Sequence, residues 1–275
     1  MSIADSNPDK LISSPQNATA KWLVALRVKR RERRAAGVTP VEGYDEIRVA
    51  LAGGARVREL YWCRELMGDR AAAQAGLLDE VGTERATEMT REVFEKVAYR
   101  EGADGWLAVV DAVGDSLGSL KLPAAALVLV CEAVEKPGNL GAMLRTADAA
   151  GADAVVAVDP RADWSSPNVV RASKGAVFTV PVATATLETF LAWARVNGLR
   201  VVAATPAAKF NYTEVDLTGG VAIAVGAEHE GLSDELMKAA DERVLIPMVG
   251  KVNSLNVATS AALLLYEATR QRSAS

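Results

Sequence analysis

The run Ala125-Ala-Leu-Val-Leu-Val-Cys131 contains no polar side chain. Similar, mostly apolar runs follow at residues 154–158, 200–204 and 221–226. A strand with one face in water alternates apolar and polar residues, whereas continuous apolar runs are typical of parallel strands covered on both faces. Helical stretches lie between these runs, notably at residues 139–150 and 187–197. The C-terminal half is therefore predicted to be an α/β fold, a mostly parallel sheet flanked by helices.

The N-terminal half has a looser α/β pattern and is predicted to form a second, smaller domain. Residues 1–17 are polar and rich in Ser, Asn and Pro, and we expect them to be a flexible leader. A basic helix is expected from Ala18 to Gly37, where the glycine can end it. Further helices and strands are predicted at residues 43–53, 57–63, 92–97 and 106–111. The Gly-, Ser- and Asp-rich stretch 114–123 is the expected linker between domains at 18–113 and 124–275.

The composition is that of an ordinary globular protein. The chain has 275 residues, which favours two domains, and half of them are apolar. The N-terminus has no signal-peptide pattern, and no uncharged apolar stretch reaches the length of about 18 residues that a membrane span needs. A cytoplasmic location with no membrane partner is therefore expected. Cys63 and Cys131 each lie in an apolar run and are expected to be buried, reduced thiols.

Positive charge is concentrated in one short segment. Residues Lys21 to Arg34 include seven basic residues and one acidic residue, a net charge of +6 in a chain whose net charge is −4. Such an asymmetry fits a phosphate-facing patch or, equally, the solvated face of a helix. Charge alone does not choose between the two interpretations.

Three loops are candidates for a ligand site, because ligands of a parallel sheet bind at the carboxyl ends of its strands. The loops span residues 135–148, 225–233 and 246–258. In the first, Asn139 can cap a helix that carries Arg145, which suggests an anion site or simply a capped helix with an exposed arginine. In the second, Gly226 permits close approach of the backbone and Glu228 follows it.

The third loop precedes a long helix rich in Ala and Leu. Polar Ser254 and Asn256 flank Leu255 directly before that helix, where polar groups can act as caps. Taken singly, each of the three loops has an ordinary structural explanation. Their occurrence together, each after a predicted strand, favours a ligand site.

Several enzyme classes lack their characteristic residues in this chain. The second loop does not have the G-x-G-x-x-G spacing, so a nicotinamide-dependent dehydrogenase loses its main support. His229, the only histidine, lies between two glutamates, and one histidine without a cysteine pair makes a poor zinc site, so no metal is expected. The chain also lacks a suitable G-x-S-x-G elbow, which argues against a hydrolase triad.

Together the three loops resemble the ordered motifs of the SpoU (TrmH-type) RNA ribose methyltransferases of the SPOUT superfamily. The matching segments are Pro137-Gly-Asn-Leu-Gly-Ala-Met-Leu-Arg-Thr-Ala147, Gly226-Ala-Glu-His-Glu-Gly-Leu-Ser233 and Ile246-Pro-Met-Val-Gly-Lys-Val-Asn-Ser-Leu-Asn-Val-Ala258. The resemblance extends over about residues 127–272 and includes a middle segment, 170–178. More loosely, residues 21–110 are similar to the L30-like (L30e-like) substrate-binding domain that many of these enzymes carry.

The resemblance implies a deep C-terminal trefoil knot, which no sequence pattern predicts because knotted chains are rare. It also implies a homodimer and an S-adenosylmethionine cofactor held mainly by backbone groups. The cofactor-binding residues would be Gly226, Ile246, Met248 and Leu255.

The resemblance further implies 2′-O-ribose methylation of RNA. Arg145 would act on the hydroxyl, and the residues that arrange the ribose and phosphate would be Asn139, Glu228, Ser254 and Asn256. RNA contacts are expected from Arg171 and, in the basic segment, from Lys29, Arg30 and Arg33. Ribosomal RNA is the expected substrate because of the N-terminal domain. The alternatives are a transfer RNA methyltransferase and a non-catalytic knotted RNA-binding protein.

Overall fold

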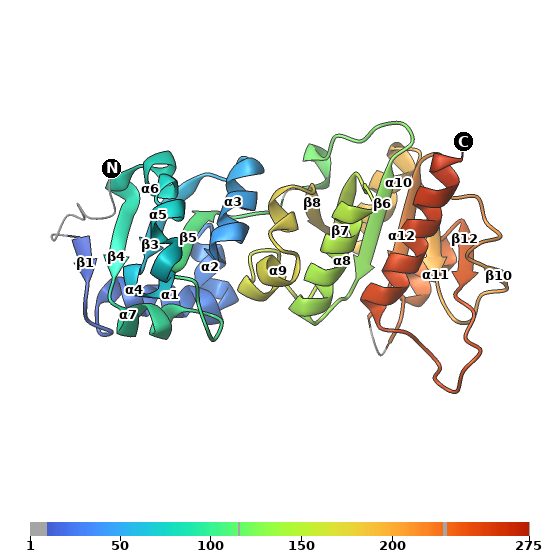
Figure 1. The fold of residues 1–275 in the computed structure, drawn as a ribbon. Coiled ribbons are helices and arrows are strands. Elements are labelled where there is room, and N and C mark those ends of the chain that lie inside the picture. Colours follow the sequence, from blue (N-terminus) through green and yellow to red (C-terminus); the bar gives the residue numbers. More distant parts are fainter. Residues whose placement is uncertain (1–9, 115, 228–229, 275) are drawn as a thin grey trace. The chain divides into compact units, whose positions relative to one another are not determined.

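The chain folds into two units, each built around its own β-sheet. The computed structural model describes residues 10–114, 116–227 and 230–274 (Figure 1). Among these, the first unit consists of the residues up to Val113 together with Ser165–Phe178. The second unit consists of Gly114–Trp164 and the residues from Thr179 onward. No helix in the described part of the chain has the length and apolar character needed to cross a membrane.

The first unit contains a mixed sheet whose described strands have the order β1-β4-β3-β5-β2. These strands are β1 (Leu11–Ile12), β2 (Val38–Glu42), β3 (Val57–Trp62), β4 (Ala86–Met89) and β5 (Trp106–Asp111). The helices are α1 (Ala18–Val28), α2 (Arg30–Ala36), α3 (Tyr44–Ala52), α4 (Arg64–Met67), α5 (Ala71–Gln74), α6 (Gly76–Val81) and α7 (Arg91–Val97). β5 pairs antiparallel with β2 and β3, whereas β4 pairs parallel with β1 and β3. The helices and strands predicted between residues 43 and 111 are thus confirmed.

The start of this unit differs from the expectation in two places. Part of the expected leader is in the sheet, because β1 pairs with β4 and the Ile12 side chain is buried. The single basic helix expected up to Gly37 is two helices, since Lys29 between them has extended backbone. Gly37 does end the second helix, with the left-handed φ of 62° that favours glycine.

A segment from later in the chain completes the first unit. Helix α9 (Pro167–Ala172) packs against β2, and the buried hydroxyls of Thr39 and Ser165 lie 2.7 Å apart. β2 is an edge strand, and covering such an edge prevents unwanted strand pairing. The sequence pattern groups residues 165–178 with the C-terminal domain, but their packing partners lie in the first unit.

The second unit contains a sheet in which every pairing between described strands is parallel. The strand order is β10-β12-β9-β11-β6-β7-β8. The strands are β6 (Leu127–Glu132), β7 (Ala154–Val158), β8 (Val182–Ala185), β9 (Arg200–Ala204), β10 (Phe210–Asn211), β11 (Val221–Val225) and β12 (Glu242–Leu245). The predicted α/β fold with a mostly parallel sheet is therefore confirmed. The four apolar runs of the sequence form its central strands β6, β7, β9 and β11.

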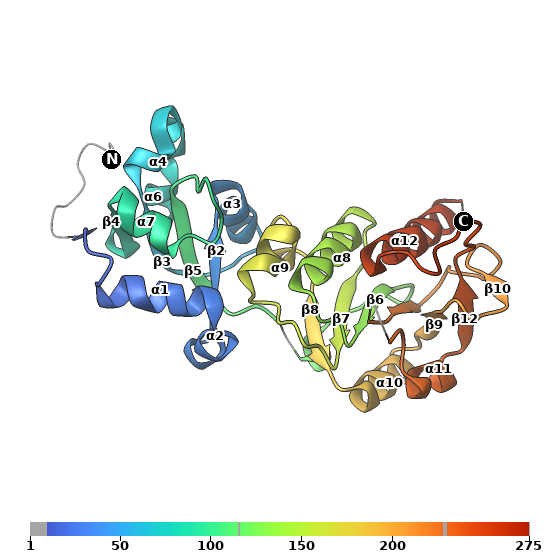
Figure 2. The same cartoon turned by 90° about the horizontal axis from the view of Figure 1, so that it is seen from below.

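Helices cover both faces of this sheet, as continuous apolar strands require (Figure 2). On one face, α8 (Pro137–Ala149) lies beside α12 (Val257–Ser273). On the other face lie α10 (Leu187–Val196) and α11 (Asp234–Ala239). Phe190 of α10 and Leu236 of α11 join the core formed with Val128 and Val130 of β6.

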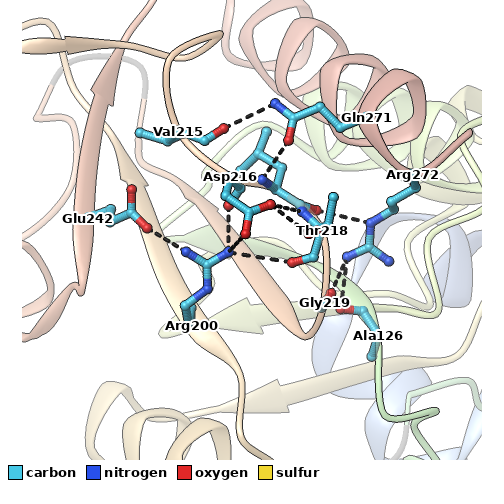
Figure 3. A network of polar contacts seen from close by, with 10 residues as sticks. Ala126, Arg200, Val215, Asp216, Thr218, Gly219, Glu242, Gln271 and Arg272 are labelled. Atoms are coloured by element: carbon cyan, nitrogen blue, oxygen red, sulfur yellow. Dashed lines mark hydrogen bonds and ion pairs between the residues drawn. The ribbon is translucent and has the colours of Figure 1, made fainter. Parts of the chain in front are cut away.

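The last turn of α12 is tied to the beginning of two central strands (Figure 3). The Arg272 guanidinium donates hydrogen bonds to the backbone carbonyls of Ala125, Ala126, Leu217 and Gly219. Gln271 accepts a 2.7 Å hydrogen bond from the Leu217 N–H and donates one of 3.0 Å to the Val215 carbonyl. Residues 125–126 precede β6 and residues 215–219 precede β11, so this polar network holds α12 against the amino-terminal ends of both strands.

We expect Arg272→Ala to lower the free energy of unfolding by about 2 kcal/mol, because several carbonyls lose their donor. Urea unfolding measures the loss. The matched control is Arg195→Ala, which removes an exposed arginine from the last turn of α10 and is expected to change stability by less than about 0.5 kcal/mol. Equal effects of the two substitutions would contradict an anchoring role for Arg272.

Candidate active site

A cavity of about 450 Å³ lies beyond the carboxyl ends of β9, β11 and β12. Its wall combines apolar side chains, among them Val225, Leu232, Met237, Val244 and Val257, with polar ones. The polar side chains are those of Thr205, Glu230, Asp234, Asn253, Ser254 and Ser260. All four residues expected to bind a cofactor, Gly226, Ile246, Met248 and Leu255, line the same cavity. Parallel strands end at one edge of the sheet, which is why loops far apart in the sequence meet there.

The loop that follows β11 folds back on itself at the rim of this cavity. Ala227 and Gly231 exchange two backbone hydrogen bonds, of 3.1 and 2.9 Å. A Cβ added to Gly226 would lie 2.1 Å from the carbonyl atoms of Gly231 and 2.3 Å from the nitrogen of Leu232. The second half of the loop therefore passes where only a glycine at position 226 leaves room.

The loop that follows β12 leads into α12, which lies on the face of the sheet opposite to α11 (Figure 2). Asn256 caps that helix, since its side-chain oxygen accepts a 2.9 Å hydrogen bond from the Ala258 N–H. Its side-chain amide donates a 3.3 Å hydrogen bond to Oδ1 of Asn139 in the first turn of α8. Two of the predicted catalytic residues are thus in direct contact, and a third, the exposed Ser254, lies two positions before Asn256 and lines the cavity.

Arg145 lies on α8, six positions after Asn139, and its side chain is exposed. Among the described residues, its guanidinium has no hydrogen-bond or ion-pair partner. Glu228, the remaining predicted catalytic residue, lies outside the described residues, as does His229.

One of the residues expected to contact RNA is instead structural. Arg33 is only 4% exposed and donates a 2.7 Å hydrogen bond to the Leu26 carbonyl. The extended backbone at Lys29 starts a new helix and turns Arg33 back onto α1, which an unbroken helix would not do. The expectation for Arg33 is therefore corrected, whereas Lys29 and Arg30 are exposed.

Arg171 is exposed and belongs to α9 in the first unit. Its guanidinium lies 5.7 Å from the centre of the Tyr99 ring, within the range of a cation–π interaction. Tyr99 is itself 40% exposed. The pair therefore presents a cation and an aromatic ring together on the surface of this unit.

Sequence reasoning missed one polar contact beside the cavity. Glu132, the last residue of β6, is 4% exposed and accepts hydrogen bonds from the backbone N–H and the hydroxyl of Ser233, at 2.7 and 2.6 Å. A carboxylate directly after a long apolar run was the signal that could have revealed it. A buried charge of this kind is costly unless it is hydrogen-bonded.

The described residues contain no cluster of three or more His, Cys, Asp or Glu side chains that could hold a metal. Cys63 and Cys131 are free and buried, as predicted. Burial raises the pKa of the Cys131 thiol to about 12, so this thiol is not a nucleophile at neutral pH.

Comparison with known proteins gives matches over most of the chain. The family model described as the SpoU rRNA Methylase family matches residues 126–266. A model described as an MRM3-like substrate binding domain matches residues 17–108.

Individual relatives span nearly the whole chain. The 23S rRNA (guanosine(2553)-2′-O)-methyltransferase RlmP of Bacillus subtilis is 31% identical over 94% of this chain and 98% of its own. A solved RNA 2′-O ribose methyltransferase is 38% identical, with a TM-score of 0.83 over 95% of this chain and 98% of the other. An AdoMet-bound rRNA methyltransferase from Sinorhizobium meliloti is 28% identical, with a TM-score of 0.86 over 95% and 97%.

We expect Gly226→Ala to destabilise the protein by about 1–3 kcal/mol, because the added methyl group would overlap the backbone at residues 231–232. The control is Gly118→Ala, where an added Cβ has no atom within 4 Å. Unfolding in urea compares the two variants. A Gly226→Ala variant as stable as the control would show that the loop does not need this close approach.

Proposed function

Because the chain belongs to the SpoU rRNA methylase family, we propose that it transfers the methyl group of S-adenosylmethionine to a ribose 2′-hydroxyl of ribosomal RNA. The observation that carries the proposal is the cavity at the carboxyl ends of β9, β11 and β12, whose wall contains the four expected cofactor-binding residues. The names of relatives that span both units support ribosomal RNA as the substrate. We assign this activity to the cytoplasm.

The cavity has the size and chemistry for S-adenosylmethionine. Its volume of about 450 Å³ lies within the usual range for small-molecule sites. Its wall combines apolar side chains with polar ones, including the carboxylates of Glu230 and Asp234, whose charge is complementary to a sulfonium. Backbone groups at four positions would hold the cofactor, and apolar side chains of the wall would contact the adenine. The four positions are Gly226, Ile246, Met248 and Leu255. When bound, this cofactor supplies an electrophilic methyl group on a sulfonium.

We propose that Arg145 stabilises negative charge that develops on the ribose oxygen. A guanidinium holds its proton too strongly to be a good base, but as a fixed cation it can stabilise an alkoxide. The hydroxyl proton then leaves to the substrate phosphate or to water as the oxygen bonds to the methyl group. The hydrogen bond between Asn139 and Asn256 links the helix that carries Arg145 to the loop at the cavity. The further roles of Glu228 and Ser254, in arranging the ribose and phosphate, belong to the same proposal.

We propose that the first unit is an L30e-like domain that holds the RNA. Lys29, between α1 and α2, and Arg30, the first residue of α2, are exposed and can contact phosphates. Arg171 and Tyr99 can contact an unpaired base, because guanidinium groups and aromatic rings both stack on bases. This surface combines charge with stacking, as RNA recognition requires.

We propose further that the second unit forms a deep trefoil knot. The contact of α12 with α8, β6 and β11 supports this topology, because the last helix returns to the centre of the sheet. The hydrogen bonds from Arg272 to the residues before β6 and β11 are consistent with a chain end held among earlier segments.

Methyl transfer is tested with S-adenosylmethionine that carries a labelled methyl group, purified protein and unmodified ribosomal or transfer RNA. We expect label at one ribose of ribosomal RNA, recognised as a linkage that resists alkaline hydrolysis. Label only in transfer RNA would overturn the substrate assignment. No label in either RNA would favour a non-catalytic RNA-binding protein.

The same assay tests Arg145 through a pH profile of Arg145→Lys. If Arg145 acts as a fixed cation, we expect a uniform loss on the order of 100-fold, because lysine cannot reproduce the planar, two-pronged donor geometry. Arg195→Lys is the control and should retain normal rates, since Arg195 is an exposed residue in the last turn of α10 and does not line the cavity. Near-normal rates shifted to lower pH in Arg145→Lys would instead indicate a true base.

A homodimer is the proposed assembly, through the outer face of α12. Leu263 and Tyr266 are 36% and 52% exposed, although both are large and apolar. They line a shallow groove with Thr259, Ala262 and Tyr212. A second copy of the chain can bury this face by isologous contact, the usual geometry of dimers.

We expect Tyr266→Asp to convert the protein to a monomer, because a buried interface would then contain an unpaired charge. Light scattering after size-exclusion chromatography measures the molar mass. The control Val196→Asp alters a residue that is 86% exposed at the end of α10, and it should leave the dimer intact. A wild-type monomer at micromolar concentration would contradict the proposed assembly.

A further inference from the structure

The carboxylate of Glu132 joins two segments that are 101 residues apart in the chain. It accepts hydrogen bonds from both donors of Ser233, the backbone N–H and the side-chain hydroxyl. The same hydroxyl accepts a 3.1 Å hydrogen bond from the Leu236 N–H and so caps α11. Glu132 thereby fixes the position at which the loop after β11 ends.

The register of the sheet places the beginning of this loop beside Glu132 as well. Cys131 pairs with Val225, so Glu132 and Gly226 are the next residues on the neighbouring strands β6 and β11. The loop leaves the sheet at Gly226 and returns to Glu132 at Ser233. Both ends of the loop that borders the cavity are thus held at the carboxyl end of β6.

The backbone after Glu132 has an unusual conformation. Ala133 has a φ of 51°, a left-handed value that is strained for a residue with a side chain. Its N–H donates a 2.9 Å hydrogen bond to the Val158 carbonyl. This turn sends the chain away from the sheet toward Pro137, where α8 begins. Strain of this kind persists only where the surrounding structure holds it in place.

We propose that Glu132 is a positioning residue for the cofactor site, and this inference rests on the proposed methyltransferase function. Its carboxylate holds Ser233 in place, and the neighbouring residues Gly231, Leu232 and Asp234 are part of the wall of the cavity. It also stands directly before the turn that leads to α8 and its predicted catalytic residues. Glu132 itself does not line the cavity, so it acts on the cofactor through the loop.

A carboxylate suits this position better than an apolar residue. The Ser233 N–H and hydroxyl would otherwise be buried without acceptors, and hydrogen bonds to a charged acceptor are stronger than those to a neutral one. Leu232, which is 8% exposed, packs into the core at the preceding position and provides a second anchor. Loss of Glu132 should therefore loosen the loop without unfolding the unit.

The test compares Glu132→Ala with the wild type in the full-length protein, using titration with S-adenosylmethionine and steady-state kinetics. We expect the dissociation constant and the KM for S-adenosylmethionine to rise about tenfold, which corresponds to one lost charge-assisted hydrogen bond. The KM for RNA and the kcat should change by less than about twofold, because the reacting groups remain in place. Glu132→Gln should recover most of the affinity, since its amide can still accept from the N–H and donate to the hydroxyl.

Two further variants make the assignment specific. Glu235→Ala removes an exposed carboxylate from the first turn of α11 and should bind S-adenosylmethionine normally. Ser233→Ala removes the hydroxyl and should weaken binding in the same direction as Glu132→Ala. The double variant should lose less affinity than the sum of the two single losses, because the two side chains share one contact, while the loss of the α11 cap belongs to Ser233→Ala alone. Should Glu132→Ala fail to fold, Ser233→Ala and Glu132→Gln carry the comparison.

Hydrogen exchange separates this inference from the proposed function. In Glu132→Ala, the amides of Gly231, Ser233 and Leu236 should exchange faster, whereas those of β6 should not. A wild type that does not bind S-adenosylmethionine would overturn the proposed function, and the exchange data would still report on the loop. Unchanged exchange and unchanged affinity in Glu132→Ala would overturn the role of Glu132.

Discussion

Parallel pairing throughout the sheet of the second unit is the constraint on which the candidate site depends. Strands that run in one direction release all their following loops at the same edge, so the loops after β9, β11 and β12 meet there although they are far apart in the sequence. Buried apolar side chains from the flanking helices pack on both faces of these strands. The chemistry of the site is then determined by what each loop carries and by how firmly it is held.

The helix α12 is held at both ends, and each end serves a different purpose. At its beginning, Asn256 caps the helix and bonds to Asn139 on α8, which brings two predicted catalytic residues into contact. At its end, Arg272 and Gln271 bind carbonyl and N–H groups that precede β6 and β11. The loop between β12 and α12 is therefore held at both of its ends, by the strand before it and by the helix after it. The loop after β11 is closed by a different contact, the one between Glu132 and Ser233.

Much of the fold could be predicted from the sequence, because continuous apolar runs identify buried parallel strands whatever their partners. The convergence of Gly226, Ile246, Met248 and Leu255 on one cavity also agrees with the expectation from the motifs. Features set by tertiary contacts were not predictable in this way. A two-residue strand such as Leu11–Ile12 is defined only by its pairing with β4, so its sequence does not predict it. The break between α1 and α2 at Lys29, after which Arg33 is buried, is not marked by a glycine or a proline.

The packing of residues 165–178 illustrates the same limit. Their motif resembles part of a methyltransferase domain, yet Ser165 and α9 pack against Thr39 and the edge strand β2. The position of these residues in the sequence does not predict their packing, because the contacts with β2 form only in the folded protein. The role of Glu132 was not predictable for a related reason. Its partner Ser233 is distant in the sequence, and only the register of β6 and β11 brings the two residues together.

The most direct test of the account is a crystal structure of the full-length protein with S-adenosylhomocysteine, the product of methyl transfer. The account predicts that the nucleoside lies in the cavity bordered by Gly226, Ile246 and Leu255, with its sulfur toward the side on which Asn139 and Arg145 lie. A nucleoside bound elsewhere on the protein, or a cavity that remains empty at saturating ligand, would contradict it.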